Sequence, residues 1–174
     1  MPLTVLVLNG PNLNLLGSRE PEIYGYETLG DVAALCERTA GSLGITVDFR
    51  QSNSESELVN WVQEARASRA GIIINAGAFT HTSVALLDAL TASDLPIIEV
   101  HLSNIFRREE FRRHSYVSLA ARGVICGFGP QGYELALAAM ARLVAKPRKR
   151  ATSTQNPLKK KSPARKSPAK GKRT

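Results

Sequence analysis

Residues 3–14 read LTVLVLNGPNLN, a short apolar run that changes abruptly to Asn, Gly and Pro. The run from Leu3 to Leu8 is short and consists of Leu, Val and Thr, which favours a β-strand. Gly10 and Pro11 follow it, and both residue types form turns. The beginning of the chain is therefore typical of a parallel sheet, whose short apolar strands end in polar loops.

Four further apolar runs repeat this pattern, each separated from the next by a longer amphipathic stretch. They predict strands at residues 45–51, 71–75, 96–100 and 124–126. Helices are predicted at residues 29–43, 54–67, 83–92 and 131–145, and the basic segment 107–114 is predicted to form another short helix. Ser54 with Glu57 indicates a capping box, and Gly44 indicates the end of the first helix. We expect an α/β fold of the flavodoxin-like type: a doubly wound, five-stranded parallel sheet with helices on both faces.

The charge of the chain is divided unevenly along its length. The 174 residues contain 23 Lys and Arg against 15 Asp and Glu, for a net charge of +8. Residues 146–174 hold twelve of the basic residues and no acid, so residues 1–145 carry a net charge of −4. We therefore expect residues 1–145 to form one flavodoxin-like catalytic domain, and residues 146–174 to be a disordered Lys/Arg/Pro-rich tail. Clustered cations of this kind allow weak binding to polyanions.

Several classes of protein are excluded by what the sequence lacks. Cys36 and Cys126 are too few for a disulfide scaffold, which favours a cytoplasmic protein. No apolar stretch is long enough to span a membrane. Neither phosphate-binding glycine motif follows the first strand, and the histidines form no metal-ligand pattern, so we expect no cofactor and no metal. Every lysine lies in the tail, which argues against a Schiff-base enzyme.

Polar residues follow three of the predicted strands, at residues 9–14, 75–81 and 99–104. Ligands of doubly wound sheets bind at the carboxyl ends of the strands, so these segments are the candidate site. Each segment also has a simpler explanation as a turn or a helix cap. Glu99 and His101 lie two residues apart, on the same face of an extended segment, where a carboxylate can orient an imidazole.

The connection at residues 10–26 is long for a strand-to-helix loop, and such loops often cover active sites. A guanidinium such as Arg19 stabilises a nearby phenolate, which would suit Tyr24 to act as a base. Tyr24 could equally anchor the loop by packing alone. After the fourth strand, four arginines offer groups that bind carboxylates or hydroxyls, although most of them are expected to face solvent. These are Arg107, Arg108, Arg112 and Arg113.

Taken together, these segments resemble the type II 3-dehydroquinate dehydratase family over about residues 3–145. The resemblance rests on LNGPNLNLLG at residues 8–17, REP at 19–21, YG at 24–25, QSN at 51–53, NAG at 75–77, THTS at 80–83, EVHLSN at 99–104 and the basic segment 108–115. It implies reversible loss of water from 3-dehydroquinate through an enolate, as in the shikimate pathway of aromatic amino acid biosynthesis or in quinate breakdown. The tail has no counterpart in the family pattern.

The resemblance also implies roles for individual residues. Tyr24 would be the base, Arg19 would stabilise its phenolate, and Asn12 would hold a water molecule on the enolate oxygen. His101, oriented by Glu99, would be the general acid. The residues implied in substrate binding are Asn75, His81, Asp88, Leu102 through its amide, Ser103 and Arg112. Asp88 would come from a neighbouring subunit of a trimer, and four trimers would form a homododecamer.

Two other functions remain compatible with the residues alone. One is a flavodoxin-like binding module in which the loops are structural and the basic tail binds a polyanion. The other is a different lyase or isomerase that acts on a sugar-like acid.

Overall fold

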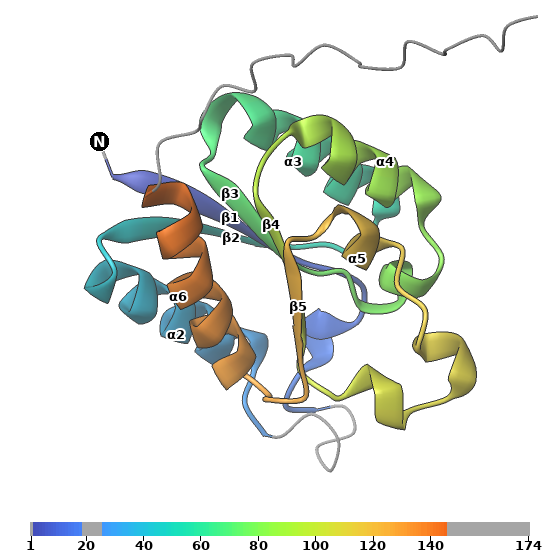
Figure 1. The fold of residues 1–174 in the computed structure, drawn as a ribbon. Helices are drawn as coiled ribbons and strands as arrows, with labels where there is room; N and C mark the ends of the chain where they lie inside the picture. Colours follow the sequence, from blue (N-terminus) through green and yellow to red (C-terminus); the bar gives the residue numbers. More distant parts are fainter. Residues whose placement is uncertain (1, 19–25, 146–174) are drawn as a thin grey trace, which may run out of the picture.

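Five parallel strands form the central sheet of the protein, in the order β2-β1-β3-β4-β5 (Figure 1). The structure is a computed structural model that describes residues 2–18 and 26–145. Its strands are β1 (Leu3–Asn9), β2 (Ile45–Gln51), β3 (Gly71–Asn75), β4 (Ile97–His101) and β5 (Gly123–Cys126). The predicted flavodoxin-like fold is confirmed. Arg19, Tyr24 and the predicted tail at residues 146–174 lie outside the described residues.

The register of the strands aligns their carboxyl ends. Asn9 pairs with Gln51 of β2 on one side and with Asn75 of β3 on the other. At the far side of the sheet, His101 of β4 pairs with Cys126 of β5. The polar residues that end these strands therefore lie along one edge of the sheet, as the sequence predicts.

Helices cover both faces of the sheet (Figure 1). One hydrophobic core lies under α2 (Leu29–Ser42) and α6 (Gln131–Ala145). The other lies under α3 (Glu55–Ser68) and α4 (Val84–Ser93), with the short helix α5 (Val117–Ala120) beside them. Alternate residues of β3 enter the two cores, because successive side chains of a strand point to opposite faces. Ile73 belongs to the first core, and Ile72 and Ile74 belong to the second.

Helix α6 runs back along the sheet, against the direction of the strands. Its first turn lies over the carboxyl end of the sheet, where Gly132 approaches Val100. About two turns later, Met140 approaches Gly71 at the beginning of β3. The end of α6 therefore lies at the edge of the sheet where the strands begin, near the beginning of β1 (Figure 1).

The helix ends follow the sequence with one exception. Gly44 adopts a φ of +71° just after α2, and Ser83 accepts the N–H of Leu86 as the cap of α4. Ser54 caps α3, but the capping box predicted with Glu57 is only half formed, because the Glu57 carboxylate instead accepts the hydroxyl of Ser52. The complete capping box described in the structure is that of α2, between Thr28 and Asp31.

The basic segment after β4 is not the α-helix that was predicted at residues 107–114. It forms two short 3-10 turns, η3 (Ile105–Arg107) and η4 (Glu110–Arg112). In these turns only Ile105 is buried. A longer helix here would have had no apolar face to bury, and packing of such a face provides most of the stability of helices in proteins.

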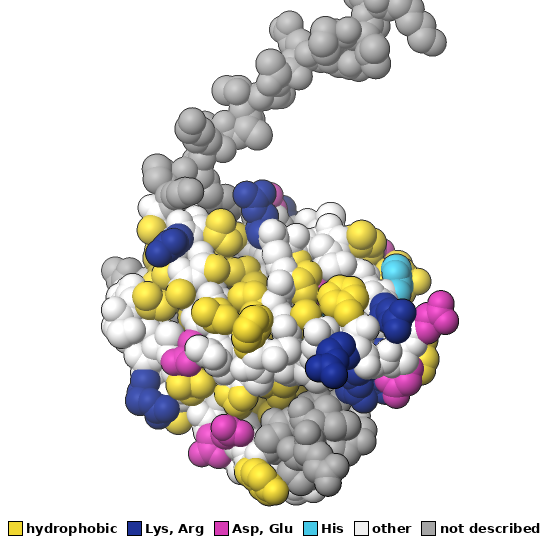
Figure 2. Space-filling view, turned by 60° about the horizontal axis from the view of Figure 1, so that its bottom comes forward, with side chains coloured by type: hydrophobic (Ala, Val, Ile, Leu, Met, Phe, Trp, Pro, Cys, Tyr) yellow, Lys and Arg dark blue, Asp and Glu magenta, His cyan; other side chains and the backbone are white. Residues whose placement is uncertain are grey.

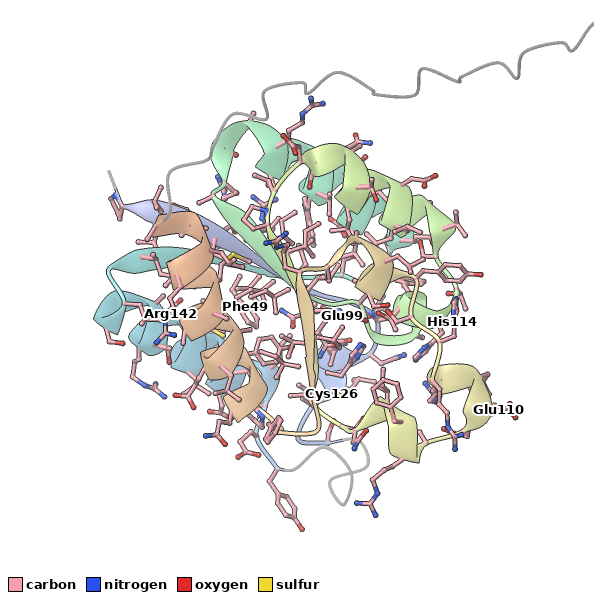
Figure 3. All side chains as sticks on the ribbon, in the orientation of Figure 1. Phe49, Glu99, Glu110, His114, Cys126 and Arg142 are labelled. Atoms are coloured by element: carbon pink, nitrogen blue, oxygen red, sulfur yellow. The ribbon has the colours of Figure 1, made fainter. Side chains whose placement is uncertain are left out.

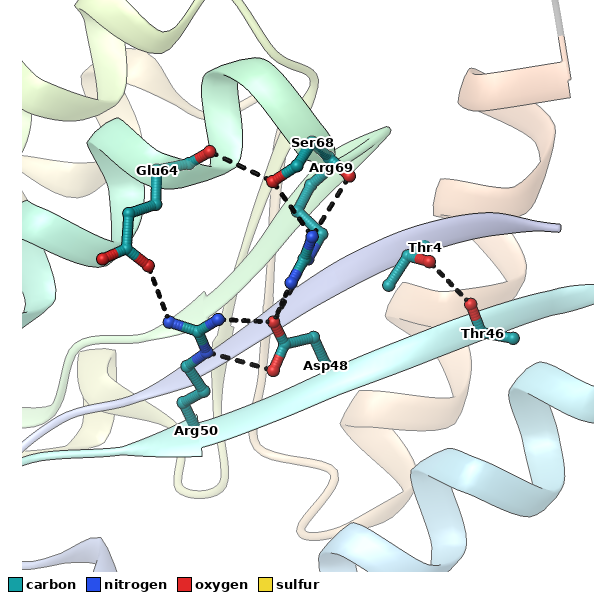
Figure 4. Close-up of polar contacts among 7 residues, drawn as sticks. All are labelled: Thr4, Thr46, Asp48, Arg50, Glu64, Ser68 and Arg69. Carbon is teal, nitrogen blue, oxygen red and sulfur yellow. Dashed lines mark hydrogen bonds and ion pairs between the residues drawn. The ribbon is translucent and has the colours of Figure 1, made fainter. Parts of the chain in front are cut away.

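A network of charged side chains joins α3 to the edge strand β2 (Figure 4). Arg50 of β2 contacts Asp48 at 2.8 Å and Glu64 of α3 at 3.0 Å. Arg69, just beyond α3, binds the same Asp48 carboxylate. The two guanidinium groups and two carboxylates of this network neutralise one another at the surface, where such pairs stabilise a protein only slightly. None of these four residues lines the cavity described below.

Gly10 is needed where the loops after β1 and β3 meet. A Cβ atom at this position would lie 2.3 Å from the carbonyl oxygen of Ala76, and the N–H of Gly10 donates to the Asn75 carbonyl at 2.8 Å. We expect Gly10→Ala to lower the free energy of unfolding by about 1–3 kcal/mol, as overpacking typically does. Gly41→Ala in α2 is the matched control, because a Cβ there meets no atom within 4 Å and alanine favours a helix. Thermal unfolding measures both, and equal stability of the two variants would contradict the close contact.

Candidate active site

A cavity of about 140 Å³ opens at the carboxyl ends of β1, β3 and β4. The structure brings seven of the predicted site residues to its wall: Asn12, Asn75, His81, His101, Leu102, Ser103 and Arg112. Arg108 lines it as well, and the remaining lining residues are Pro11, Leu13, Leu15, Leu16, Gly77, Ala78 and Ile105. Segments far apart in the sequence therefore form one mixed polar and apolar cavity at the edge where ligands of this fold bind.

His101 and Glu99 form a buried pair at the wall of the cavity. The Nε2 atom of His101 lies 2.7 Å from Oε1 of Glu99. Glu99 is fully buried and His101 is 5% exposed. Because a carboxylate only accepts hydrogen bonds, Nε2 carries a proton, which leaves Nδ1 as the ring nitrogen able to exchange a proton with a bound molecule. The arrangement is that of an imidazole oriented by an acid.

Two hydroxyl groups hold the Glu99 carboxylate from behind. Thr80 Oγ1 and Ser115 Oγ donate to Oε1 at 2.7 Å and 2.8 Å, and Ser115 also lies 3.0 Å from Oε2. Burial, the largest single influence, opposes the charge of Glu99, but the hydrogen bonds and the charge of His101 outweigh it and lower the pKa of the carboxyl. Figure 3 shows Glu99 in the interior, whereas Glu110 of η4 lies at the outer rim (Figure 3). Glu99 is therefore an anion held in place.

His81 is oriented by the backbone. Its Nδ1 atom lies 2.7 Å from the carbonyl oxygen of His114. A carbonyl can only accept, so Nδ1 carries the proton and Nε2 is an acceptor when the ring is neutral. Burial lowers the pKa of His81, with smaller contributions in the same direction from His101 and Arg112. The ring is therefore suited to accept a hydrogen bond from a ligand hydroxyl at neutral pH.

The loop after β1 is held by Gln51, the last residue of β2, and by Asn53 just beyond it. Asn12 has a left-handed backbone with a φ of +67°. Its N–H donates to Oδ1 of Asn53 at 2.9 Å, and Gln51 Nε2 donates to the same oxygen and to the carbonyl of Gly10. A residue with a positive φ needs such support from its surroundings. The QSN segment at residues 51–53 thus fixes the position of Asn12 at the mouth of the cavity.

Charged residues of the η3–η4 region form the rim of the cavity. Arg112 Nε donates to Glu109 at 3.0 Å, and Arg108 lies 3.6 Å from the same carboxylate. Figure 2 shows Lys/Arg side chains gathered beside Asp/Glu side chains on this side of the molecule (Figure 2). Two guanidinium groups at the wall of a small cavity favour a negatively charged or hydroxylated ligand.

Two predicted residues that the structure describes, Glu99 and Asp88, do not line the cavity, although Glu99 contacts His101 directly behind its wall. Asp88 lies on the exposed surface of α4 and does not line the cavity. Arg19 and Tyr24 lie outside the described residues. Sequence reasoning missed Thr80, Ser115 and Tyr133, of which the last is described below. Thr80 and Ser115 occur within the quoted motifs, but nothing in their spacing indicates that they meet at Glu99.

Within residues 2–18 and 26–145, no group of three or more His, Cys, Asp or Glu side chains is arranged to hold a metal ion. No helix in these ranges is both long and apolar enough to cross a membrane.

Comparison with known proteins finds relatives of one kind, and they match the same part of the chain. Residues 3–141 match the family model for dehydroquinase class II. The chain is 63% identical over 142 residues to the 3-dehydroquinate dehydratase of Methylobacterium radiotolerans, covering 82% of this chain and 95% of that relative. It is 62% identical over 137 residues to 3-dehydroquinate dehydratase 2 of Pseudomonas aeruginosa, covering 79% and 93%. The crystal structure of a type II dehydroquinase from Propionibacterium acnes matches with a TM-score of 0.79 at 47% identity, covering 82% of this chain and 98% of that one.

The flavodoxin-like sheet, with an oriented histidine in a cavity at its carboxyl edge, defines an α/β protein equipped for acid–base chemistry. Matches of this length and identity are specific to a single family. The chain belongs to the class II dehydroquinase family. The alternative of a binding module with purely structural loops is not favoured.

Proposed function

We propose that this chain catalyses the reversible elimination of water from 3-dehydroquinate to 3-dehydroshikimate, a hydro-lyase reaction, in the cavity at the carboxyl edge of the sheet. The proposal accords with the names of its relatives. The single observation that carries it is the 2.7 Å contact between His101 and the buried Glu99 at the cavity wall. The product is a conjugated enone, so its ultraviolet absorption after addition of 3-dehydroquinate tests the activity. Absence of that absorption with the folded protein would refute the proposal.

In the proposed reaction, two proton transfers are separated by an enolate. A base removes a proton from C2, next to the C3 carbonyl, and the electron pair forms the enolate. The enolate then re-forms the carbonyl as the bond between C1 and its hydroxyl oxygen breaks. His101 delivers the proton that turns this hydroxyl into water. The carboxylate of Glu99 stabilises the doubly protonated ring that this step requires.

The base is assigned to Tyr24 and its activation to Arg19, both from the sequence. A phenol has a pKa near 10, and an adjacent guanidinium stabilises the phenolate that must take the C2 proton. Asn12 is proposed to hold a water molecule against the enolate oxygen, where charge develops. The hydrogen bond that the Asn12 N–H donates to Asn53, which Gln51 in turn holds, supports this role, since electrostatic stabilisation requires a group placed in advance.

Substrate binding is assigned to the other residues of the cavity. Asn75, Ser103 and the backbone amide of Leu102 are proposed to bind the end that carries the carboxylate. The carbonyl of Leu102 accepts the N–H of Gly129 at 2.9 Å, which keeps this loop in place. His81 and Arg112 are proposed to contact the ring hydroxyls, consistent with the free Nε2 acceptor of a neutral His81 and the guanidinium beside it.

Asp88 is proposed to complete the site of a neighbouring subunit. Its exposed position on α4 leaves its carboxylate accessible to another copy of the chain. The proposed assembly is a trimer, with four trimers in a homododecamer. The proposed pathway is aromatic amino acid biosynthesis in the cytoplasm.

Replacing Glu99 by glutamine is expected to lower kcat on the order of ten-fold, less than removal of His101 does. The amide keeps the shape of the carboxylate but loses its charge, and its NH2 group must face one of the donors that now surround Glu99. Steady-state kinetics of Glu99→Gln and His101→Ala, with thermal unfolding of both, make the comparison. Equal damage to kcat in two equally folded variants would rule out a simple orienting role for Glu99.

Residues 1–145 are proposed to be the catalytic domain, and residues 146–174 a separate polyanion-binding tail. Deleting 146–174 removes twelve positive charges and no described helix or strand, since α6 ends at Ala145. We expect the truncated chain to keep its turnover. The full chain should be retained on heparin at low salt and released as salt rises, whereas the truncated chain should not be retained. Equal retention of both forms, or a large loss of kcat on truncation, would contradict this division.

A further inference from the structure

A buried chain of hydrogen bonds lies behind the cavity and joins three elements of the fold. The hydroxyl of Tyr133, in the first turn of α6, donates to Oδ1 of Asn9 at the end of β1, at 2.6 Å. Nδ2 of Asn75, at the end of β3, donates to the same hydroxyl at 3.0 Å. Tyr133 and Asn9 are fully buried, and neither lines the cavity, whereas Asn75 does. This chain of hydrogen bonds therefore connects Asn75, at the cavity wall, to two buried side chains behind the wall.

At each end of this hydrogen-bonded chain, an asparagine side chain bonds to a backbone group that can only accept or only donate a hydrogen bond. Asn9 Nδ2 donates to the carbonyl of Arg50 at 3.1 Å, and a carbonyl can only accept. Asn9 must therefore present its oxygen to Tyr133, so the phenol donates to it. At the other end, the N–H of Gly77, which can only donate, lies 3.3 Å from Oδ1 of Asn75. Both ends thus require the same orientation of the Asn75 amide, with Nδ2 toward Tyr133.

We propose that Tyr133 is a positioning residue that sets the orientation of the Asn75 amide for substrate. One N–H of Nδ2 is used by Tyr133, so the amide offers the cavity its second N–H and the remaining lone pair of Oδ1. Without the hydroxyl, the weaker contact with Gly77 would be the hydrogen bond left, among the described residues, to oppose rotation of the amide by 180°. The inference rests on the proposed role of Asn75 in binding 3-dehydroquinate. It gives α6 a part in the site, although Tyr133 is 124 residues from Asn9 in the sequence.

The surroundings of the phenol support a directional role. Burial raises the pKa of Tyr133 far above its ordinary value, so the hydroxyl keeps its proton and remains a donor to Asn9. A phenylalanine would fill the same space in the first core without bringing a polar atom into it. A buried hydroxyl is stabilising only when its hydrogen bonds are made, and here both are made to the ends of neighbouring strands.

A double-mutant cycle between Tyr133→Phe and Asn75→Ala tests the proposal. We expect Tyr133→Phe to lower kcat/KM for 3-dehydroquinate roughly ten-fold in the otherwise unchanged chain, because the amide loses its preferred orientation. In the Asn75→Ala background the same substitution should change kcat/KM less than about two-fold, since no amide remains to be oriented. Equal effects in the two backgrounds would overturn the proposal, because a merely structural role of Tyr133 does not depend on Asn75.

Two further variants separate this effect from loss of stability. Leu137→Val, one turn along α6 and in the same core, weakens packing but removes no polar atom of the hydrogen-bonded chain, so kcat/KM should hardly change. Asn9→Ala keeps the phenol but removes its acceptor. Asn9→Ala should lower kcat/KM in the chain that has Asn75, but not in the Asn75→Ala background. It can therefore take the place of Tyr133→Phe in the double-mutant cycle if that variant fails to fold. If Asn75→Ala leaves kcat/KM unchanged, Asn75 does not bind the substrate, and the proposed role of Tyr133 is wrong as well. The proposed reaction would not be contradicted, because the protein would still convert 3-dehydroquinate.

Discussion

Replacing His101 by alanine is expected to lower kcat about a hundred-fold to ten-thousand-fold, the usual contribution of a general acid. The departing hydroxyl would then leave as hydroxide or depend on water for its proton. The substitution also leaves Glu99 buried without its main partner, so some loss of stability should accompany the loss of rate. Measurement of kcat with 3-dehydroquinate, beside thermal unfolding, separates the two effects.

The matched control is His114→Ala. The His114 side chain is exposed and packs edge-on against Tyr116, while the contact with His81 uses only its backbone carbonyl. This variant should keep nearly normal turnover. A similar kcat for the His101 and His114 variants would remove His101 from the mechanism.

Replacing Tyr24 by phenylalanine is expected to cause a comparably severe loss of kcat, on the order of a hundred-fold or more, with KM nearly unchanged. The substitution removes the hydroxyl proposed as the base and keeps the volume of the ring. Because the proton at C2 must leave before the enolate forms, no later step can compensate. Exchange of the C2 proton with deuterated solvent gives a second readout, and it should slow together with kcat.

Tyr26 provides the control for this variant. It lies two residues further along the same loop and its side chain is 82% exposed. Tyr26→Phe should retain full activity. If instead Tyr24→Phe turned over substrate at the normal rate, the base would have to be a different group.

The fold is largely readable from the sequence because its strands are apolar runs bounded by turn residues. All five predicted strands and all four longer predicted helices occur, with boundaries that differ by at most one residue. The errors lie where local patterns are weak. The segment after β4 has charges at helical spacing but no apolar stripe, and Glu57 prefers Ser52 to the helix end that it was expected to cap.

The site is readable only in part, for a physical reason. The Glu99–His101 pair is two residues apart on one strand, so the period of the strand alone predicts the contact that the structure shows. Ser115 reaches the same carboxylate across 16 residues, and Tyr133 reaches Asn9 across 124. Such contacts depend on how helices and loops dock on the sheet, which no local pattern encodes. Tyr133 also resembles an ordinary core residue, because its position in α6 fits the apolar stripe.

The opposite placement of the cavity and the end of α6 has a practical consequence for handling the protein as a catalyst. The cavity opens where the strands end, whereas Ala145 lies at the edge where they begin. A bead, a surface or a fused carrier protein linked through residues after Ala145 would therefore be attached on the side away from the entrance. Immobilisation through this end should leave substrate access intact, whereas coupling through side chains near η3 and η4 would crowd the entrance.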